Sequence, residues 1–242
     1  MADVHFCLDF GNTRKKVGYF QGEKLINEIV LQEDYVSHLS ELLEYYQPTS
    51  CILSSVVHHN TAVNDLLSEH STFVLLDHAT PLPFLNAYGS PKTLGNDRLA
   101  LVAGLKQFYP NRNSLAISIG TCITYNFLAA NHTFRGGAIS PGVHLRLKSM
   151  HEFTDKLPLV DDRGYDDILG FDTETSIRSG AMNGVAAEID GMINRYRDEY
   201  GQINAVLTGG DTRYFARRIK NEIFADQYFT LKGLYAILIH NA

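Results

Sequence analysis

The segment "DFGNTRKK", from Asp9 to Lys16, combines residue types that can handle phosphate. It follows an apolar run, so the aspartate stands at the end of an expected strand and the glycine stands in the turn after it. Backbone N–H groups around such a turn can point together at an anion, and a carboxylate before the turn can hold Mg²⁺ through water. Two interpretations follow: a phosphate loop, or a hairpin turn whose polar side chains satisfy their own backbone.

A similar segment recurs in the second half of the chain. When residues 4–25 are laid over residues 113–134, apolar positions coincide and Gly11 falls on Gly120. The polar pair after the first glycine then coincides with Thr121 and Cys122. Each copy predicts a strand, a glycine turn, a second strand, a polar turn and a third strand. The repeat predicts two β-meanders, one at the start of each half, and favours the phosphate loop.

A second acidic residue, Asp97, stands in the motif "LGNDR", where a helix is expected over residues 96–108. In the first helical turn its charged form is favoured by the positive end of the helix. Phosphoryl-transfer enzymes use such an aspartate to accept the proton of the substrate hydroxyl. Alternatively, Asp97 is the N-cap of the helix, a position that aspartate often occupies. The spacing leaves both interpretations open.

Three weaker motifs are "FRGGAISPGV" (134–143), "TETSIRSGAMNG" (173–184) and "TGGD" (208–211). The glycines of the first motif permit close backbone approach, and those of the second permit close helix packing. Those of the third break a strand at a turn beside which an adenosine can bind. Ordinary loops and core helices use the same residues for the same reasons. The sequence has neither a P-loop nor a dinucleotide fingerprint, so a nucleotide must be held in another way.

The remaining pattern alternates helices and strands. Helices are expected over 35–46, 61–69, 173–200 and 212–220, and strands over 51–57, 72–76 and 203–211, which is α/β alternation. A duplicated meander followed by such units predicts two similar lobes, residues 1–110 and 111–242, with a cleft between them. Each lobe is expected to be a mixed sheet flanked by helices.

Composition narrows the classes of partner. The chain has 242 residues, of which 45% are hydrophobic and 20% charged, as in a globular protein. A net charge of −6 argues against a nucleic-acid partner, and no apolar run is long enough for a membrane span. The three separated cysteines, Cys7, Cys51 and Cys122, predict reduced thiols in a cytoplasmic protein. The acidic net charge favours a small-molecule partner, and the histidines lack zinc-site spacing, so no zinc site is expected.

In chain order, the motifs "DFGNT", "LGNDR", "SIGTCIT", "GGAISPG", "TSIRSG" and "TGGD" resemble those of the type III pantothenate kinases. The resemblance covers residues 9 to about 211 and places the chain in the actin, sugar-kinase and heat-shock-ATPase superfamily, with two actin-like (ribonuclease H-like) lobes. It implies ATP-dependent phosphorylation of pantothenate to 4′-phosphopantothenate, the first step of coenzyme A biosynthesis. It also implies Mg²⁺, a monovalent cation (K⁺ or NH₄⁺), and a homodimer whose second subunit helps to form the pantothenate pocket.

The same resemblance implies a role for individual residues. ATP is assigned to the first loop and its partner in the second lobe: Asp9, Phe10, Gly11, Asn12, Thr13, Arg14, Lys15, Lys16 and Thr121. Pantothenate is assigned to Tyr88, Gly95, Asn96, Asp97, Arg98 and Thr173. Asp97 is the implied proton acceptor, and Asp9 is the implied Mg²⁺ ligand, acting through water.

The sequence departs from the family pattern in three places. The family usually has aspartate before the second glycine turn, as a ligand for the monovalent cation, whereas this chain has Ser118. A hydroxyl supplies an oxygen but no charge, so weaker K⁺ binding is expected. Asn96 replaces the common alanine, and the extra basic residues Arg14, Lys15 and Lys16 are expected to strengthen phosphate binding.

Two alternatives to pantothenate kinase activity remain open. One is a related kinase that phosphorylates a sugar or a carboxylate. The other is a non-catalytic homologue that binds ligand and regulates a partner. Ser118, in place of the family's aspartate, is the feature that suggests this alternative. Retention of both Asp9 and Asp97 favours activity.

Overall fold

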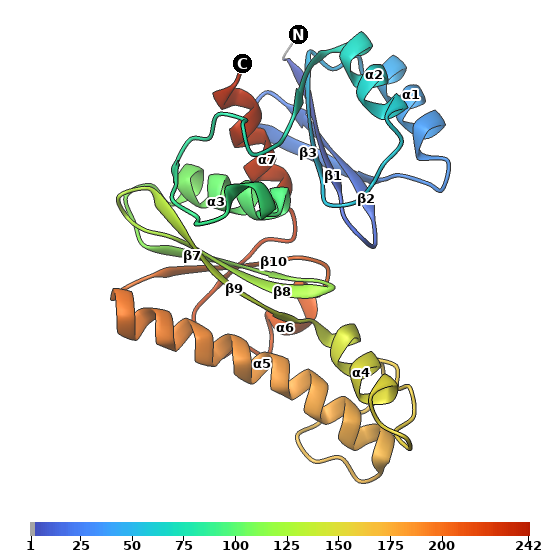
Figure 1. Cartoon of the computed structure of the whole chain (residues 1–242), viewed down its shortest axis with the longest axis vertical. Helices are drawn as coiled ribbons and strands as arrows, with labels where there is room; N and C mark the ends of the chain where they lie inside the picture. The colour runs from blue at the N-terminus through green and yellow to red at the C-terminus, as the bar shows by residue number, and fades with distance from the viewer. Residues whose placement is uncertain (1–2) are drawn as a thin grey trace. The chain divides into compact units, whose positions relative to one another are not determined.

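The computed structural model describes residues 3–242 and has a mixed α/β architecture (Figure 1). The strands are β1 Val4–Phe10, β2 Lys15–Gln21, β3 Lys24–Val30, β4 Ser50–Ser55, β5 Thr72–Leu75, β6 Leu85–Asn86, β7 Ser114–Ile119, β8 Cys122–Leu128, β9 Thr133–Pro141, β10 Asn204–Thr208 and β11 Phe224–Ala225. The α-helices are α1 Tyr35–Tyr46, α2 Ala62–His70, α3 Asn96–Phe108, α4 Val143–Glu152, α5 Thr173–Tyr200, α6 Thr212–Phe215 and α7 Phe229–His240.

The first sheet contains the first predicted meander. Its strand order is β3-β2-β1-β4-β5, with β1, β2 and β3 antiparallel and β1, β4 and β5 parallel. Alternate residues of β1, including Leu8 and Phe10, pack into a core with Leu39 of α1 and Leu67 of α2. The helices α1 and α2 therefore cover one face of this sheet (Figure 1), and α7 packs against β1 and β4.

The second sheet contains the second predicted meander. Its order is β11-β10-β7-β8-β9-β6, and β10 runs parallel to β7. The long helix α5 begins at a capping box, in which Asp172 and Thr175 satisfy each other's backbone N–H groups. The predicted helix bounds 96–108 and 173–200 are confirmed.

The helix predicted over 212–220 is wrong in length, because α6 ends at Phe215. Phe215 and Ile219 are spaced as on a helix face, and both are buried. After α6 the chain continues in turns, in which the N–H groups of Arg218 and Ile219 both donate to the Phe215 carbonyl oxygen. At the end of the predicted helix, the N–H groups of Lys220 and Asn221 donate to the Asp190 carboxylate instead of to helical carbonyl groups.

Packing contacts divide the chain into two compact units. Unit 1 contains the residues up to Asn111 together with 128–136 and 228–242, and unit 2 contains 112–127 and 137–227. The lobe boundary predicted between residues 110 and 111, and the cleft between the lobes, stay predictions. Unit 1 is discontinuous because α7 packs closely on α3: a Cβ at Gly233 would lie 1.8 Å from the carbonyl oxygen of Ala100. No helix within residues 3–242 is long and apolar enough to cross a membrane.

Candidate functional site

Asp9 lies near the end of β1, opposite Lys16 on β2, and its side chain is only partly exposed. The pKa of the Asp9 carboxyl is raised to about 7, first by burial and then by the negative charge of Asp97, while Lys16 opposes the shift. Lys16 also forms an ion pair with Glu28, with Nζ 2.8 Å from Oε2. Because its charged form is disfavoured, Asp9 has a marked electrostatic preference for an additional cation.

Asp97 approaches Asp9 from α3, as the electrostatic effect of Asp97 on Asp9 shows. The helix begins at Asn96 with Gly95 as its N-cap, so Asp97 is the second helical residue and the N-cap interpretation is wrong. Burial raises the pKa of the Asp97 carboxyl, while hydrogen bonds from the Arg98 and Asp97 backbone N–H groups and the Arg98 charge lower it. The structure thus brings the two predicted acidic residues together within unit 1.

The two residues that precede Asp97 determine the packing at the start of α3. A Cβ at Gly95 would lie 2.5 Å from Asp97 Oδ1, so any larger residue there must displace the carboxylate. The Asn96 side chain donates to the Leu76 carbonyl oxygen at 2.7 Å and ties the helix start to the residue after β5. In this structure the Asn96 amide therefore has a structural role, because it joins the start of α3 to Leu76.

Arg98 is buried among aromatic rings. Its side chain is 5% exposed, and its guanidinium lies 5.6 Å from the ring centre of Tyr88 and 5.9 Å from that of Phe134. The two rings stack with centres 6.0 Å apart. Tyr88, Asp97 and Arg98 are thus brought to one region of unit 1. The sequence did not indicate Phe134 as a site residue, although it is the first residue of the motif "FRGGAISPGV".

The first glycine turn is tight and its tip is open to solvent. The Gly11 N–H donates to the Arg14 carbonyl oxygen at 3.0 Å, and Asn12, Thr13 and Arg14 are exposed. The Lys15 ammonium lies 4.5 Å from the ring centre of Tyr35. Phe10, by contrast, is fully buried in the core of unit 1, so its side chain anchors the loop.

The second glycine turn lies in unit 2 and has a similar bond. The Gly120 N–H donates to the Cys122 carbonyl oxygen at 3.1 Å, Thr121 is exposed, and Ser118 on β7 is partly exposed. A Cβ at Gly142 would lie 2.0 Å from the Gly120 carbonyl oxygen. The last glycine of "GGAISPG" therefore permits the close backbone approach that the sequence suggested.

Thr173 is the exposed first residue of α5. The same motif supplies three side chains that hold the preceding loop to α5, which sequence reasoning missed. Arg178 donates from Nε to the Asp161 carbonyl oxygen, Ser179 donates to that of Ile168, and Asn183 donates to that of Asp166, each at 2.9 Å. The arginine and serine of "TSIRSG" therefore position the loop that leads into the helix.

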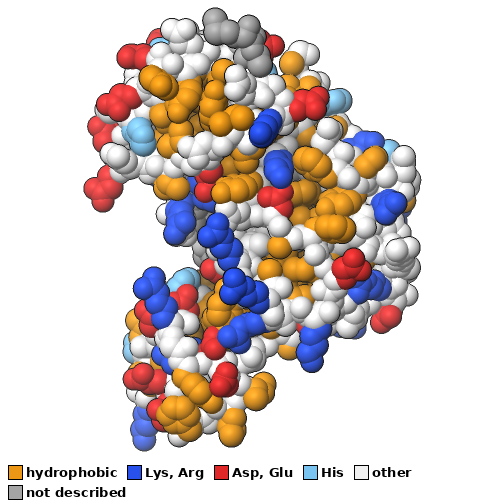
Figure 2. Space-filling view, turned by 180° about the vertical axis from the view of Figure 1, so that it is seen from behind, with side chains coloured by type: hydrophobic (Ala, Val, Ile, Leu, Met, Phe, Trp, Pro, Cys, Tyr) orange, Lys and Arg blue, Asp and Glu red, His pale blue; other side chains and the backbone are white. Residues whose placement is uncertain are grey.

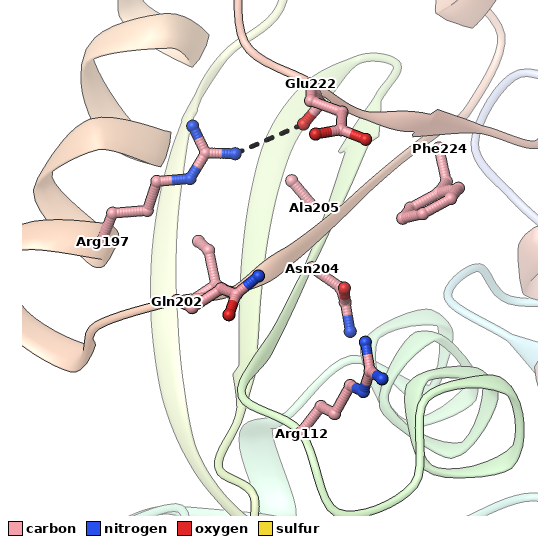
Figure 3. A pocket seen from close by; sticks show the side chains of 8 residues that line it. Arg112, Arg197, Gln202, Asn204, Ala205, Glu222 and Phe224 are labelled. Atoms are coloured by element: carbon pink, nitrogen blue, oxygen red, sulfur yellow. Dashed lines mark hydrogen bonds between the residues drawn. The ribbon is translucent and has the colours of Figure 1, made fainter.

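A cavity of about 450 Å³ in unit 2 involves none of the predicted site residues. It is lined by Arg112, Arg197, Gln202, Ile203, Asn204, Ala205, Glu222 and Phe224. Figure 3 shows Arg197 reaching across it to the Glu222 carbonyl oxygen. Asn204 is the first residue of β10, whereas Thr208, the start of "TGGD", is the last. The cavity is thus at the end of β10 away from that motif.

The chain shares its fold with solved sugar kinases. Over 99% of both chains it resembles a ROK hexokinase from Thermus thermophilus, with a TM-score of 0.54 and 13% identity. A Baf family protein from Campylobacter jejuni gives a TM-score of 0.63 and 18% identity, over 98% of both chains. These similarities confirm the predicted actin-like α/β fold.

Sequence comparison identifies the family. Residues 5–195 match the family model of type III pantothenate kinase. The type III pantothenate kinase of Christiangramia forsetii is 38% identical over 240 residues, which cover 98% of this chain and 99% of that protein. The one from Bacteroides fragilis is 38% identical over 239 residues and covers 98% of each chain. The chain therefore belongs to the type III pantothenate kinase family.

Proposed function

We propose that the protein uses ATP to phosphorylate pantothenate to 4′-phosphopantothenate, the first step of coenzyme A biosynthesis. The observation that carries this proposal is the convergence of Asp9 and Asp97 in unit 1, in a chain of this family. Arg98, which is held beside Tyr88, adds a positive charge that suits the carboxylate of pantothenate.

The proposed reaction is direct transfer. The pantothenate hydroxyl oxygen forms a bond to the γ-phosphorus, the bond from that phosphorus to the bridging oxygen breaks, and ADP leaves. Asp97 accepts the hydroxyl proton, and the exposed turn that follows Gly11 offers backbone N–H groups to phosphate oxygens. Mg²⁺, when bound, neutralises charge on the β and γ phosphates. Positioning and charge stabilisation therefore account for most of the catalysis.

Asp9 suits an indirect role toward Mg²⁺. It offers carboxylate oxygens, the ligand type that Mg²⁺ prefers, and burial disfavours its charged form in the absence of a further cation. Among the described residues, no cluster of three or more His, Cys, Asp or Glu side chains is arranged to hold a metal. We therefore assign Asp9 to a Mg²⁺ ion that is held mainly by phosphate oxygens and water.

We also propose that the protein is a homodimer. Large apolar side chains are exposed in unit 2 on α4 and in the loop before α5: Leu145, Phe153, Leu159, Tyr165, Ile168, Leu169 and Phe171. In Figure 2, apolar side chains are exposed among charged ones on the face that is drawn. Many large apolar side chains exposed on two consecutive segments favour a protein partner, and a second copy agrees with the family. Sedimentation of the purified protein tests this proposal.

A coupled ADP-release assay tests the proposed reaction. We expect ADP release to depend on pantothenate and not on glucose or other alcohols offered at the same concentration. Release with a sugar alone would favour a related small-molecule kinase. Pantothenate binding without ADP release would favour a regulatory homologue.

Binding of a monovalent cation is expected to be weak because Ser118 lacks charge. We predict that Ser118→Asp lowers the K⁺ concentration needed for half-maximal activity, since a carboxylate attracts K⁺ more strongly than a hydroxyl does. Titration of K⁺ and NH₄⁺ into both proteins in the ADP-release assay measures this change. Equal cation dependence of the two proteins would contradict the assignment of Ser118.

The first loop offers a test of phosphate binding. We predict that the double variant Lys15→Ala, Lys16→Ala raises the KM for ATP, because two positive charges near the phosphates are lost. Lys24→Ala, Lys92→Ala is the matched control, since it removes two lysines from elsewhere in unit 1. An unchanged KM for ATP in the Lys15→Ala, Lys16→Ala variant would contradict the assignment of these lysines to phosphate binding.

A further inference from the structure

The Ser54 hydroxyl is a fully buried polar group near the predicted nucleotide site. The residue is 0% exposed, and Oγ has no hydrogen-bond partner among the described residues. Burial of a hydroxyl without a hydrogen-bond partner is unfavourable. Native structures satisfy such groups almost everywhere, so each exception calls for a specific explanation. A partner that bonds only when a ligand is bound provides one.

Strand pairing places Ser54 beside Asp9. The two residues are directly opposite each other in the parallel pair β1–β4. Neighbouring strands are about 4.8 Å apart, and paired residues point to the same face of the sheet. Leu8, Phe10 and Leu53, which alternate with them, face the core formed with α1 and α2. Asp9 and Ser54 therefore share the opposite face, where α3 and α7 contact β4.

Unit 2 contains the same arrangement. Thr208 is 0% exposed, and its Oγ1 also has no hydrogen-bond partner within residues 3–242. It is paired with Ser118 across β7 and β10. In the sequence repeat Ser118 corresponds to Asp9, because each is two residues before the glycine of its turn. A buried hydroxyl therefore recurs opposite the residue that precedes each glycine turn.

We propose that Ser54 is a positioning residue for Asp9. When the metal-bound nucleotide occupies the site, the Ser54 hydroxyl donates a hydrogen bond to one oxygen of the Asp9 carboxylate. That bond fixes the direction in which the other oxygen faces the bound ligand. The inference rests on the proposed function only in that Asp9 serves the metal-bound nucleotide. The identity of the phosphate acceptor does not enter into it.

A double-mutant cycle on ATP binding tests this role. Calorimetry with and without Mg²⁺ is carried out on the wild type, Ser54→Ala, Asp9→Asn and the double variant. We expect Ser54→Ala to weaken Mg²⁺-dependent ATP binding roughly tenfold, the effect of one hydrogen bond to a charged group. In the Asp9→Asn background the same change should have little effect, because interacting residues are not additive. Without Mg²⁺ the effect should be absent.

Matched variants separate positioning from packing. Ser50 is on the same face of β4, is 8% exposed, and already has a partner in the His5 ring at 2.8 Å. We therefore expect Ser50→Ala to lower the melting temperature and leave ATP affinity unchanged. Ser54→Ala should keep or raise the melting temperature of the ligand-free protein. Ser54→Thr and Ser54→Val add similar volume, and only the threonine variant should retain Mg²⁺-dependent affinity.

The outcomes distinguish this inference from the proposed function. Additive losses in the cycle, an equal loss without Mg²⁺, or equal affinities of the threonine and valine variants would overturn the role of Ser54. If pantothenate is not phosphorylated but the cycle is non-additive, the proposed acceptor fails and the role of Ser54 stands. A wild-type protein that does not bind ATP with Mg²⁺ would overturn both.

Discussion

Asp97→Asn is expected to lower kcat by about a hundredfold or more, the usual effect of losing a general base. Asparagine keeps the shape of the side chain, and its Oδ1 can still accept the backbone N–H groups at the start of α3. Burial already disfavours the charged form of Asp97, as its raised pKa shows. The neutral variant should therefore melt at the same temperature as the wild type or higher. Steady-state kinetics and thermal unfolding measure the two effects.

Asp65→Asn is the matched control for this variant. Asp65 also lies in the first turn of a unit 1 helix, α2, but its side chain is exposed. We expect its kcat to remain that of the wild type. A near-native kcat for Asp97→Asn would show that another group accepts the proton. A fall in melting temperature together with kcat would instead indicate a structural role for Asp97.

Gly233→Ala is expected to lower the free energy of unfolding by about 3 kcal/mol, at the upper end of the usual cost of overpacking. The added Cβ would lie 1.8 Å from the Ala100 carbonyl oxygen and 2.6 Å from its carbonyl carbon. Both are backbone atoms of α3, so no side chain can rotate to make room. The helices α3 and α7 must separate, which exposes buried residues such as Leu234. Urea unfolding measures the loss.

Gly191→Ala is the control for helix propensity. Gly191 is also inside a helix, α5, but a Cβ there would meet no atom within 4 Å. Alanine favours the helical conformation over glycine, so this variant should gain about 0.5–1 kcal/mol. Opposite signs for the two variants would support the close contact of α3 and α7. Equal stabilisation of both would contradict that contact.

The long helices could be predicted from the sequence because their local signals agree with their packing. The helix α3 begins after a glycine and α5 begins after Asp172, whose side chain caps it, and both ends match the prediction. The two meanders were predicted for the same reason, since alternating apolar residues and turn residues are local. The helix expected over 212–220 is shorter, and its last predicted residue, Lys220, donates its backbone N–H to the carboxylate of Asp190, a residue distant in sequence.

The candidate site was only partly accessible from sequence. The types and spacing of Asp9 and Asp97 suggested their chemistry, and the structure brings them close. The sequence did not indicate Ser54 or Phe134 as site residues. The place of Ser54 beside Asp9 depends on strand register, and that of Phe134 depends on ring packing, which the sequence pattern does not specify. The roles assigned to Thr121, Ser118 and Thr173 stay predictions, and the K⁺ titration of Ser118→Asp tests that of Ser118.

The discontinuity of unit 1 has a consequence for how the protein is made. During synthesis, the residues of β1 to α3 emerge from the ribosome long before α7 is made, yet α7 packs against β1, β4 and α3. Until residues 229–240 emerge, the nascent chain must carry the apolar surface that Leu231, Leu234 and Ile237 later cover. Unit 1 can therefore reach its final packing only after unit 2 has been translated, although most of its residues are made first.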